Sequence, residues 1–370
     1  MAIDTLGANA LASNSVTTAK IAADAVTSAK IPAGAVVASD VADGSVTTAK
    51  LADNAVTSAK ALNLGRRNLI INGSMTNWQR GTSFSSNVYG CDRWKFYAPG
   101  SHANTRSTDT PDSPNNFKYS NSCGGSGDAT GITQFIESGN CVHVPTSGST
   151  KVILSFYLKH TTNSGTAKIT SVVGTMDVAD TSGATTNRST QNHNTTTSWA
   201  RYTHEMSGAD LTAAATNGLQ VTIKHNGSGT TLFLVTGVQL EIAEAATDYE
   251  RQFGKDELED CKRYFQRISG FRQGAYSSCM ISYATSAAQG TIHFQTPMFS
   301  TPSITLEGAG MKLEDGGNAY TSSNTTVAGQ LGSENHINFW MGGFSGLTDG
   351  NPYYCYGDDA NHYMDLSAEL

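Results

Sequence analysis

The segment from Val16 to Asp40 reads "VTTAKIAADAVTSAKIPAGAVVASD" and repeats with a period of ten residues. One column of the repeat is valine, and a second column, five residues later, is isoleucine, valine or leucine. The two apolar columns together are Val16, Ile21, Val26, Ile31, Val36, Val41, Val46, Leu51 and Val56. A third column holds lysine at positions 20, 30, 50 and 60, and Asp40 interrupts it. A repeat this regular governs the architecture of its segment.

The five-residue step between the apolar columns excludes a single amphipathic helix. Five residues turn an α-helix by about 140°, so the apolar side chains would spread over every face. The same step reverses the face of a strand, so one straight strand cannot bury both columns. Small polar stretches such as "AAD", "PAG" and "ADG" lie between the columns. The pattern therefore predicts short strands separated by tight turns.

The repeat carries too little apolar surface to fold as one chain. Each unit holds two medium-sized apolar residues and no aromatic residue, which does not offset the entropy of ordering about ten residues. We predict that residues 15–64 form a β shaft in which identical chains, most simply three, share one apolar axis. Stacked coils within one chain and a disordered linker are the alternatives. The strict register of the columns favours the shaft over the linker.

Composition narrows the possible partners. Charged residues make up 15% of the 370, against about 25% in ordinary globular chains. The net charge of −7 comes without a basic stripe, so nucleic-acid binding is not expected. No apolar run approaches about 18 residues, so membrane insertion is not expected either. The opening "MAIDTLGANALASNS" lacks the basic and apolar regions of an export signal.

No constellation of residues predicts an enzyme, a metal site or a cofactor. The six cysteines form no C-x-x-C pair, and we expect free, mostly buried thiols, with disulfides left open. The nine histidines show no metal-ligand spacing, and neither a P-loop nor a G-x-S-x-G motif occurs. Adjacent Asp358 and Asp359 are the first pair to test for glycan hydrolysis, although two neighbouring aspartates are more often a turn.

Residues 65–250 are predicted to form a β-sandwich. Apolar and polar residues alternate in "LQVTIKH" (219–225) and "VQLEIAE" (238–244), as in half-buried antiparallel strands. The segment "KVILSFYLKH" (151–160) is apolar on both faces, which is typical of a central strand. The segment from Thr181 to Ser198 is polar throughout, and we interpret it as a long loop.

A junction helix is predicted within residues 251–269. Asp256 has the spacing to Glu259 of an N-cap with its capping box. An apolar stripe at helical spacing consists of Leu258, Cys261, Phe265 and Ile268. The stripe suits either docking on the helix's own sandwich or packing with two other copies around an axis.

Residues 270–370 are predicted to form a second β-rich domain with a glycan-binding end. Strand-like segments such as "CMISYAT" and "HINFWMGGF" precede a region rich in aromatic residues, glycine and aspartate. Sugars are bound by aromatic faces together with carboxylates and amides. The candidate set is Trp340, Tyr353, Tyr354, Tyr356, Asp358, Asp359 and His362. The alternative for each aromatic residue is packing in the core of a small domain.

Two motifs carry a resemblance to a known family. The segments "RNLIINGSMTNWQRGTSF" (67–84) and "YGCDRWKFY" (89–97) resemble the opening of a sandwich domain common in bacteriophage tail fibres. Residues 238–267 resemble the close of that domain, and residues 294–308 resemble a fibre-tip pattern. The matching positions in the two opening motifs are Asn68, Leu69, Asn72, Gly73, Trp78, Gln79, Arg80, Gly81, Asp92, Arg93 and Trp94.

The resemblance implies an all-β, elongated, homotrimeric tail fibre in the virion, made in the host cytoplasm, with a jelly-roll-like sandwich and a C-terminal tip. Residues 1–14 would attach to a phage tail or adaptor protein, and the tip would recognise a host-surface glycan such as lipopolysaccharide. A polysaccharide-depolymerising tail spike and a purely structural tail or collar component are the rival interpretations. Independently of the family, Trp78 and Trp94 beside Arg80 and Arg93 predict a core edge with guanidinium stacking or carboxylate pairing, and sugar binding is the lesser alternative.

Overall fold

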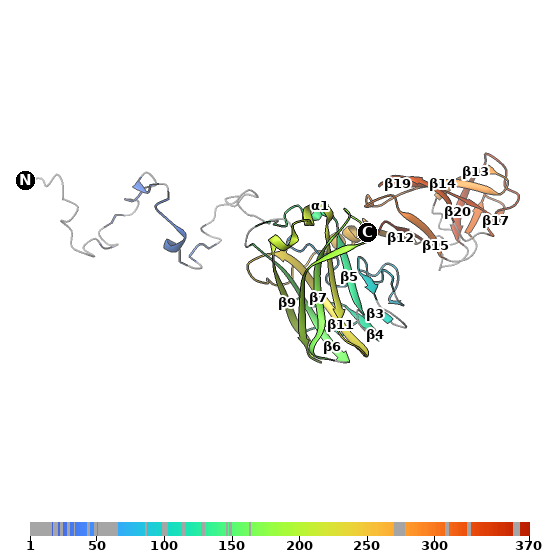
Figure 1. Ribbon diagram of the computed structural model, residues 1–370. Helices are drawn as coiled ribbons and strands as arrows, with labels where there is room; N and C mark the ends of the chain where they lie inside the picture. Colours follow the sequence, from blue (N-terminus) through green and yellow to red (C-terminus); the bar gives the residue numbers. More distant parts are fainter. Residues whose placement is uncertain are drawn as a thin grey trace, which may run out of the picture. The chain divides into compact units, whose positions relative to one another are not determined.

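The computed structural model describes residues 17, 21–22, 25–27, 30–32, 34–42, 45–47, 50, 66–85, 87–97, 103–112, 115–126, 130–145, 147, 150–162, 164–269, 278–307, 311–323, 327–357 and 363–370. The chain divides into two compact units, Met1–Gly65 and Arg66–Leu370. Within the described residues it is almost entirely β, with two short α-helices, which confirms the all-β prediction (Figure 1). None of the helices in the described residues is both long and apolar enough to cross a membrane.

The described residues of the repeat form turns and no strand. A backbone hydrogen bond closes a turn every five residues, each running from an amide to the carbonyl three residues earlier. The donor amides belong to Ala25, Lys30, Ala35, Asp40, Ser45 and Lys50. One turn is extended into the 3-10 helix η3 (Ala38–Asp40). The predicted strand segments are therefore wrong here, because a four-residue turn uses most of each five-residue step.

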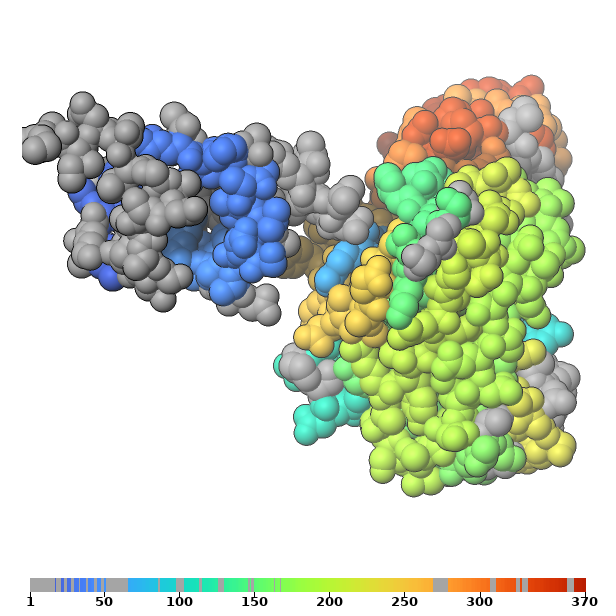
Figure 2. All heavy atoms as spheres, turned by 60° about the vertical axis from the view of Figure 1, so that its left-hand side comes forward, coloured from blue at the N-terminus to red at the C-terminus, as the bar shows by residue number. Residues whose placement is uncertain are grey.

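Every described apolar column residue of the repeat is exposed in the single chain. Exposed fractions run from 41% at Val41 to 58% at Val36 (Figure 2, blue). The column residues Val16, Leu51 and Val56, and the predicted attachment segment 1–14, lie outside the described residues.

The lysine column caps the turns of the repeat. The Nζ atoms of Lys30 and Lys50 donate to carbonyls five residues earlier, at 2.7 and 2.6 Å. Asp40, which replaces lysine in this column, instead accepts a hydrogen bond from the amide of Val37 at 3.0 Å. The polar column thus stabilises the turns, whereas the described residues of the apolar columns are exposed.

The sandwich consists of two antiparallel sheets around one core (Figure 1). The six-stranded sheet has the order β1 (Ser83–Phe84), β3 (Ala103–Ser107), β4 (Ser120–Ser126), β11 (Thr230–Ile242), β6 (Lys151–Thr162) and β9 (Ala200–Ser207). The five-stranded sheet has the order β2 (Lys95–Tyr97), β5 (Gly131–Ile136), β10 (Leu219–His225), β7 (Gly165–Met176) and β8 (Thr185–Thr195). Inward side chains such as Phe156, Phe233 and Val221 are fully buried between them. The sandwich and the inner position of β6 confirm the predictions.

Short helical segments follow the strands at one end of this fold. They are η5 (Ser138–Cys141), η6 (Gly208–Leu211) and α1 (Ala214–Asn217). Cys141, Leu211 and Ala214 turn inward from them and close that end of the sandwich core.

One polar segment of the sandwich was predicted incorrectly. Residues Thr185–Thr195 form the edge strand β8, within the range predicted as a loop from Thr181 to Ser198. An edge strand with most side chains in solvent needs no apolar alternation. His193 and Thr195, which turn inward, are themselves polar, so the sequence lacks the usual signal.

The junction helix is shorter than predicted. Helix α2 spans Gly254–Lys262, with Phe253 at the N-cap position and Asp256 inside the first turn, so Asp256 is not the cap. Phe265 and Ile268 lie on strand β12 (Phe265–Ser269), which pairs with β21 (Tyr363–Ser367), so this pairing replaces the last predicted helical turns. The helix docks on its own sandwich, where Arg66 contacts Asp260 at 2.5 Å.

The C-terminal domain has two further antiparallel sheets. A three-stranded sheet has the order β12, β21 and β15 (Ser303–Glu307). A seven-stranded sheet has the order β17 (Ala319–Thr321), β16 (Met311–Glu314), β20 (Pro352–Gly357), β13 (Ser278–Ala284), β14 (Ala287–His293), β19 (His336–Gly342) and β18 (Ala328–Gly332). Their shared core includes Met280, Leu313 and Phe339.

The two arginines of the opening motifs hold the last residues of the chain against the sandwich. Glu369 forms ion pairs with Arg93 and with Arg80. The guanidinium groups also stack on aromatic rings of the junction: Arg80 lies 3.5 Å from the centre of the Phe265 ring, and Arg93 lies 3.4 Å from that of Tyr264. Both predicted interactions, stacking and carboxylate pairing, are confirmed.

Other polar groups of the opening motifs and their neighbours also serve the fold. The Tyr89 hydroxyl donates to the main-chain oxygen of Leu370 at 2.9 Å. Trp94 is buried and donates its Nε1 proton to the carbonyl of Asn72 at 3.0 Å. Trp78 donates to the carbonyl of Met75 at 2.7 Å. All six cysteines are free thiols and five are buried, as predicted, with Cys279 exposed.

Candidate functional site

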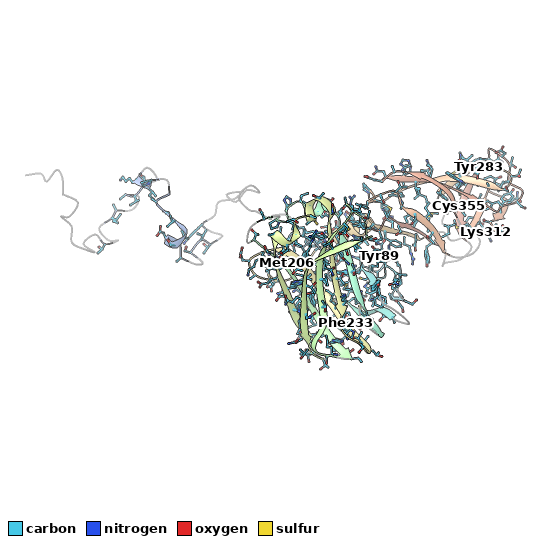
Figure 3. The ribbon with its side chains drawn as sticks, viewed as in Figure 1. Tyr89, Met206, Phe233, Tyr283, Lys312 and Cys355 are labelled. Carbon is cyan, nitrogen blue, oxygen red and sulfur yellow. The ribbon has the colours of Figure 1, made fainter. Side chains whose placement is uncertain are left out.

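The seven-stranded sheet has one face in the core and one face open to solvent. Along β13, Met280 is fully buried, whereas Ile281 and Tyr283 are 51% and 48% exposed. Figure 3 labels Tyr283 at this sheet. Tyr354 on β20 is also 51% exposed, and it pairs with Cys279 of β13. Exposed apolar and aromatic side chains therefore gather on one sheet face.

An open groove of about 740 Å³, which we call the tip groove, lies over this face. The pairing of the strands places three of its lining residues side by side: Ile281 pairs with Gln289, and Gln289 pairs with Trp340 on the next strand. Three strands thus present an aliphatic side chain, an amide and an indole in one row. Strand β12 supplies Gln266 and Ile268 to the lining as well.

Hydrogen-bonding groups surround Trp340 in the tip groove. The Thr291 hydroxyl donates to the Asn338 side-chain oxygen at 2.6 Å, so this bond does not use the amide protons of Asn338. His293 and His336 pair across β14 and β19, with ring centres 5.9 Å apart. None of the described residues that line the groove is an aspartate or glutamate. The groove therefore offers an aromatic surface with hydroxyl, amide and imidazole groups, a combination that suits sugar hydroxyls and C–H faces.

The predicted glycan-binding set is only partly brought together. Trp340 lines the tip groove, and Tyr354 lies on the same sheet face without being among its lining residues. Asp358, Asp359 and His362 lie outside the described residues.

Two of the predicted tyrosines are core residues. Tyr353 is 1% exposed, its hydroxyl accepts a hydrogen bond from the amide of Thr348, and its ring packs edge-on against Tyr320. Tyr356 is 3% exposed. Both predictions are corrected, because the alternation along β20 turns Tyr353 inward and Tyr356 is buried as well.

Sequence reasoning missed most of the groove lining. Ile281, Gln289, Thr291 and Asn338 come from three strands, and only the strand order places them beside Trp340. One signal was present in "CMISYA", where cysteine, isoleucine and tyrosine alternate with residues that the structure buries. A strand with apolar residues on both faces indicates that its second face is also used.

Comparisons with known proteins give similarities of fold only. No family model matches the sequence, and no curated protein matches it. Among solved structures, the CBM22-1 xylan-binding domain from Paenibacillus barcinonensis Xyn10C is 17% identical with a TM-score of 0.29, over 44% of this chain and 94% of that one.

Two further structures show the same level of similarity. A putative sugar-binding protein from Bacteroides thetaiotaomicron is 11% identical with a TM-score of 0.31, over 48% of this chain and 100% of that one. The enzymatically active domain of bacteriophage CBA120 tailspike protein 4 is 14% identical with a TM-score of 0.29, over 48% of this chain and 21% of that one. These similarities are weak, and we infer no property of the chain from them.

Proposed function

We propose that the protein is a bacteriophage tail fibre that adheres to its host by binding a surface glycan, such as lipopolysaccharide, in the tip groove. The observation that carries the proposal is the row Ile281, Gln289 and Trp340 on an open sheet face, flanked by Thr291 and Asn338. An indole beside amides and a hydroxyl matches the alternating apolar and polar surface of a sugar ring.

The proposed assembly is a homotrimer that is attached to the phage tail or an adaptor protein through residues 1–14. The described apolar columns of the repeat are exposed in one chain, and burial against two further copies would remove them from water. Three chains would also present three tip grooves. Multivalent attachment gains a factor of about 10²–10⁴ over a single weak contact, which suits an adhesin.

The test compares two tryptophan variants of the full-length chain. Trp340→Ala removes the indole of the tip groove, and Trp199→Ala removes a partly exposed indole of the sandwich that donates to Asp109. Binding to a panel of purified lipopolysaccharides and capsular polysaccharides is measured by surface plasmon resonance. We expect Trp340→Ala to weaken binding at least tenfold and Trp199→Ala to leave it unchanged. A ring stacked on an aromatic side chain contributes about 1–3 kcal/mol to binding, and 1.4 kcal/mol corresponds to a factor of about ten.

Equal binding by both variants would show that the glycan site does not lie in the tip groove. The same samples are assayed for new reducing ends, because the proposal is of a non-enzymatic adhesin. Release of reducing ends by the wild-type chain would contradict it and favour the depolymerising tail spike. Absence of binding to every polysaccharide, with the fold intact, would favour a purely structural virion component.

A further inference from the structure

A second open groove, of about 400 Å³, lies on the sandwich over the outer face of the five-stranded sheet. We call it the sandwich groove. It shares no lining residue with the tip groove. Its described lining comes from all five strands of that sheet and from the turn that precedes β8.

Two rows of paired residues form part of the floor of the sandwich groove. One row places Lys95 beside Thr133 and Thr222. The next row has Gly131 between Tyr97 and Lys224. Gly131 has no room for a side chain, since an added Cβ would lie 2.3 Å from the carbonyl oxygen of Ile223. The glycine therefore permits a close approach of β5 to β10 at the position between Tyr97 and Lys224.

The sandwich groove is electropositive. Lys95 and Lys224 both line it, and the described lining contains no aspartate or glutamate. Neither lysine forms an ion pair with another described residue. Two half-buried lysines without an acidic partner favour an anionic ligand, because partial burial strengthens the attraction that bulk water would weaken.

Uncharged groups in the same groove suit sugar hydroxyls. The hydroxyls of Thr133 and Thr222 lie 2.8 Å apart, and the Gln220 side-chain nitrogen donates to Thr222 at 3.1 Å. The Oε1 atom of Gln220 is buried without a hydrogen-bond partner. Because that oxygen has almost no exposed surface, the hydroxyl of half-buried Thr222 is the group of this cluster that is open to a ligand. Tyr97 adds a ring that is 51% exposed.

We propose that the sandwich groove is a second saccharide site, specific for an acidic sugar segment. Lys95 and Lys224 would bind the anionic substituents, Tyr97 would contact the C–H face of a ring, and the Thr222 hydroxyl would bond to a sugar hydroxyl. The site does not depend on the tip groove. A fibre with both grooves would contact two chemically different parts of a surface polysaccharide.

The test measures binding of the full-length chain to tetragalacturonate by isothermal titration calorimetry, with maltotetraose and inorganic phosphate as the other two probes. The Lys95→Gln/Lys224→Gln variant removes both charges of the groove. The control, Lys118→Gln/Lys255→Gln, removes two exposed lysines that line neither groove. Tetragalacturonate is expected to bind at low salt and to bind more weakly as the ionic strength rises.

The groove variant is expected to lose at least tenfold in affinity for tetragalacturonate, and the control variant is expected to bind as the wild type does. Trp340→Ala should also bind normally, which separates this site from the tip groove. Absence of binding, or equal loss in both lysine variants, would overturn the proposal. So would maltotetraose binding as tightly as tetragalacturonate, or phosphate displacing tetragalacturonate at equal concentration, since the first removes the charge specificity and the second indicates a simple anion site.

Discussion

Glu369 is the single side chain on which the contact between the last residues and the sandwich most depends. Its carboxylate pairs with Arg93, whose side chain is 1% exposed, and with Arg80. Arg93 also donates to the carbonyl of Phe135 at 2.6 Å. A guanidinium this deeply buried is stable only when its charge is balanced. Removal of Glu369 would therefore leave a buried positive charge without a counter-charge.

Glu369→Ala is therefore expected to lower the free energy of unfolding by about 3–5 kcal/mol, because it leaves Arg93 buried without its counter-charge. The matched control is Glu205→Ala, which removes an exposed partner of Lys151 and should cost no more than about 1 kcal/mol. Urea unfolding followed by tryptophan fluorescence measures both. Similar small losses in the two variants would show that the buried pair is not stabilising.

Three buried histidines of the sandwich make its stability sensitive to acid. Burial lowers the pKa of His160, His193 and His204 from 6.5 to about 4. Neighbouring His225 and Lys168 lower that of His160 further, and His193 lowers that of His204. The neutral rings are held by hydroxyls: His160 contacts Thr195 at 2.8 Å, and His204 contacts Ser171 at 2.9 Å.

The folded chain binds fewer protons than the unfolded chain between about pH 6.5 and pH 4, so stability falls as the pH is lowered through this window. Each histidine contributes on the order of 1–3 kcal/mol by pH 4. Asp92 acts in the opposite direction, because burial raises its pKa to about 6, although Arg80 opposes the rise. Burial also raises the pKa of Glu257 and Asp260. At Glu137 and Asp109, burial is outweighed by hydrogen bonds from Arg263 and Lys159, which lower the pKa of the two carboxyls. Because the three histidines carry large shifts of the same sign, the urea midpoint should fall from pH 7 to pH 4. A flat or rising midpoint would contradict the assignment.

At the scale of elements, strands with an apolar face were predictable from the sequence. A polar edge strand, and a strand that pairs with a distant part of the chain, were not. The alternation in β10 and the two-sided apolar pattern of β6 identify both strands from the sequence alone. Strand β8 has no such pattern, and Phe265 was assigned to a helix because its spacing from Cys261 is four residues. The pairing of Phe265 with Ser367, 102 residues later, cannot be seen in local spacing.

The candidate site was predictable only where a residue's own chemistry identifies it. Trp340 was included because aromatic residues, glycine and aspartate concentrate in the terminal region, whereas Gln289 and Asn338 are unremarkable in sequence. They become part of a groove through the strand order β13, β14, β19, which antiparallel pairing sets over long separations. Tyr353 was misassigned because inward and outward positions along β20 differ by one residue.

Helix α2 offers a direct test of its corrected N-terminus. Phe253 occupies the N-cap position in an extended conformation, makes no side-chain cap and is 83% exposed. Phe253→Ser supplies a hydroxyl that can accept from the free amides of the first turn, and we expect it to raise the free energy of unfolding by about 0.5–2 kcal/mol. Phe253→Ala is the control, without a cap. Equal stability of the two variants would contradict a helix start at Gly254.

For the whole molecule, the described residues of the repeat raise the question of assembly, because their apolar columns are exposed. Its turns are closed by backbone hydrogen bonds, and lysines 30 and 50 cap carbonyls, but the apolar columns remain exposed. Turns closed by hydrogen bonds, together with exposed apolar columns, suit a shaft that several chains share. This exposure, together with the strict period, is the basis for proposing that three chains assemble.

The most direct test of the fibre account is the molar mass of the purified full-length protein, measured by light scattering. One chain has a mass of 39.0 kDa, and the account predicts three times that value. The variant Val26→Ser/Val36→Ser/Val46→Ser should lower the mass or broaden its distribution, because it removes apolar side chains from the shared axis, while Lys30→Gln/Lys50→Gln should remain trimeric. A wild-type mass equal to one chain would contradict the shared shaft and favour the linker or the single-chain solenoid.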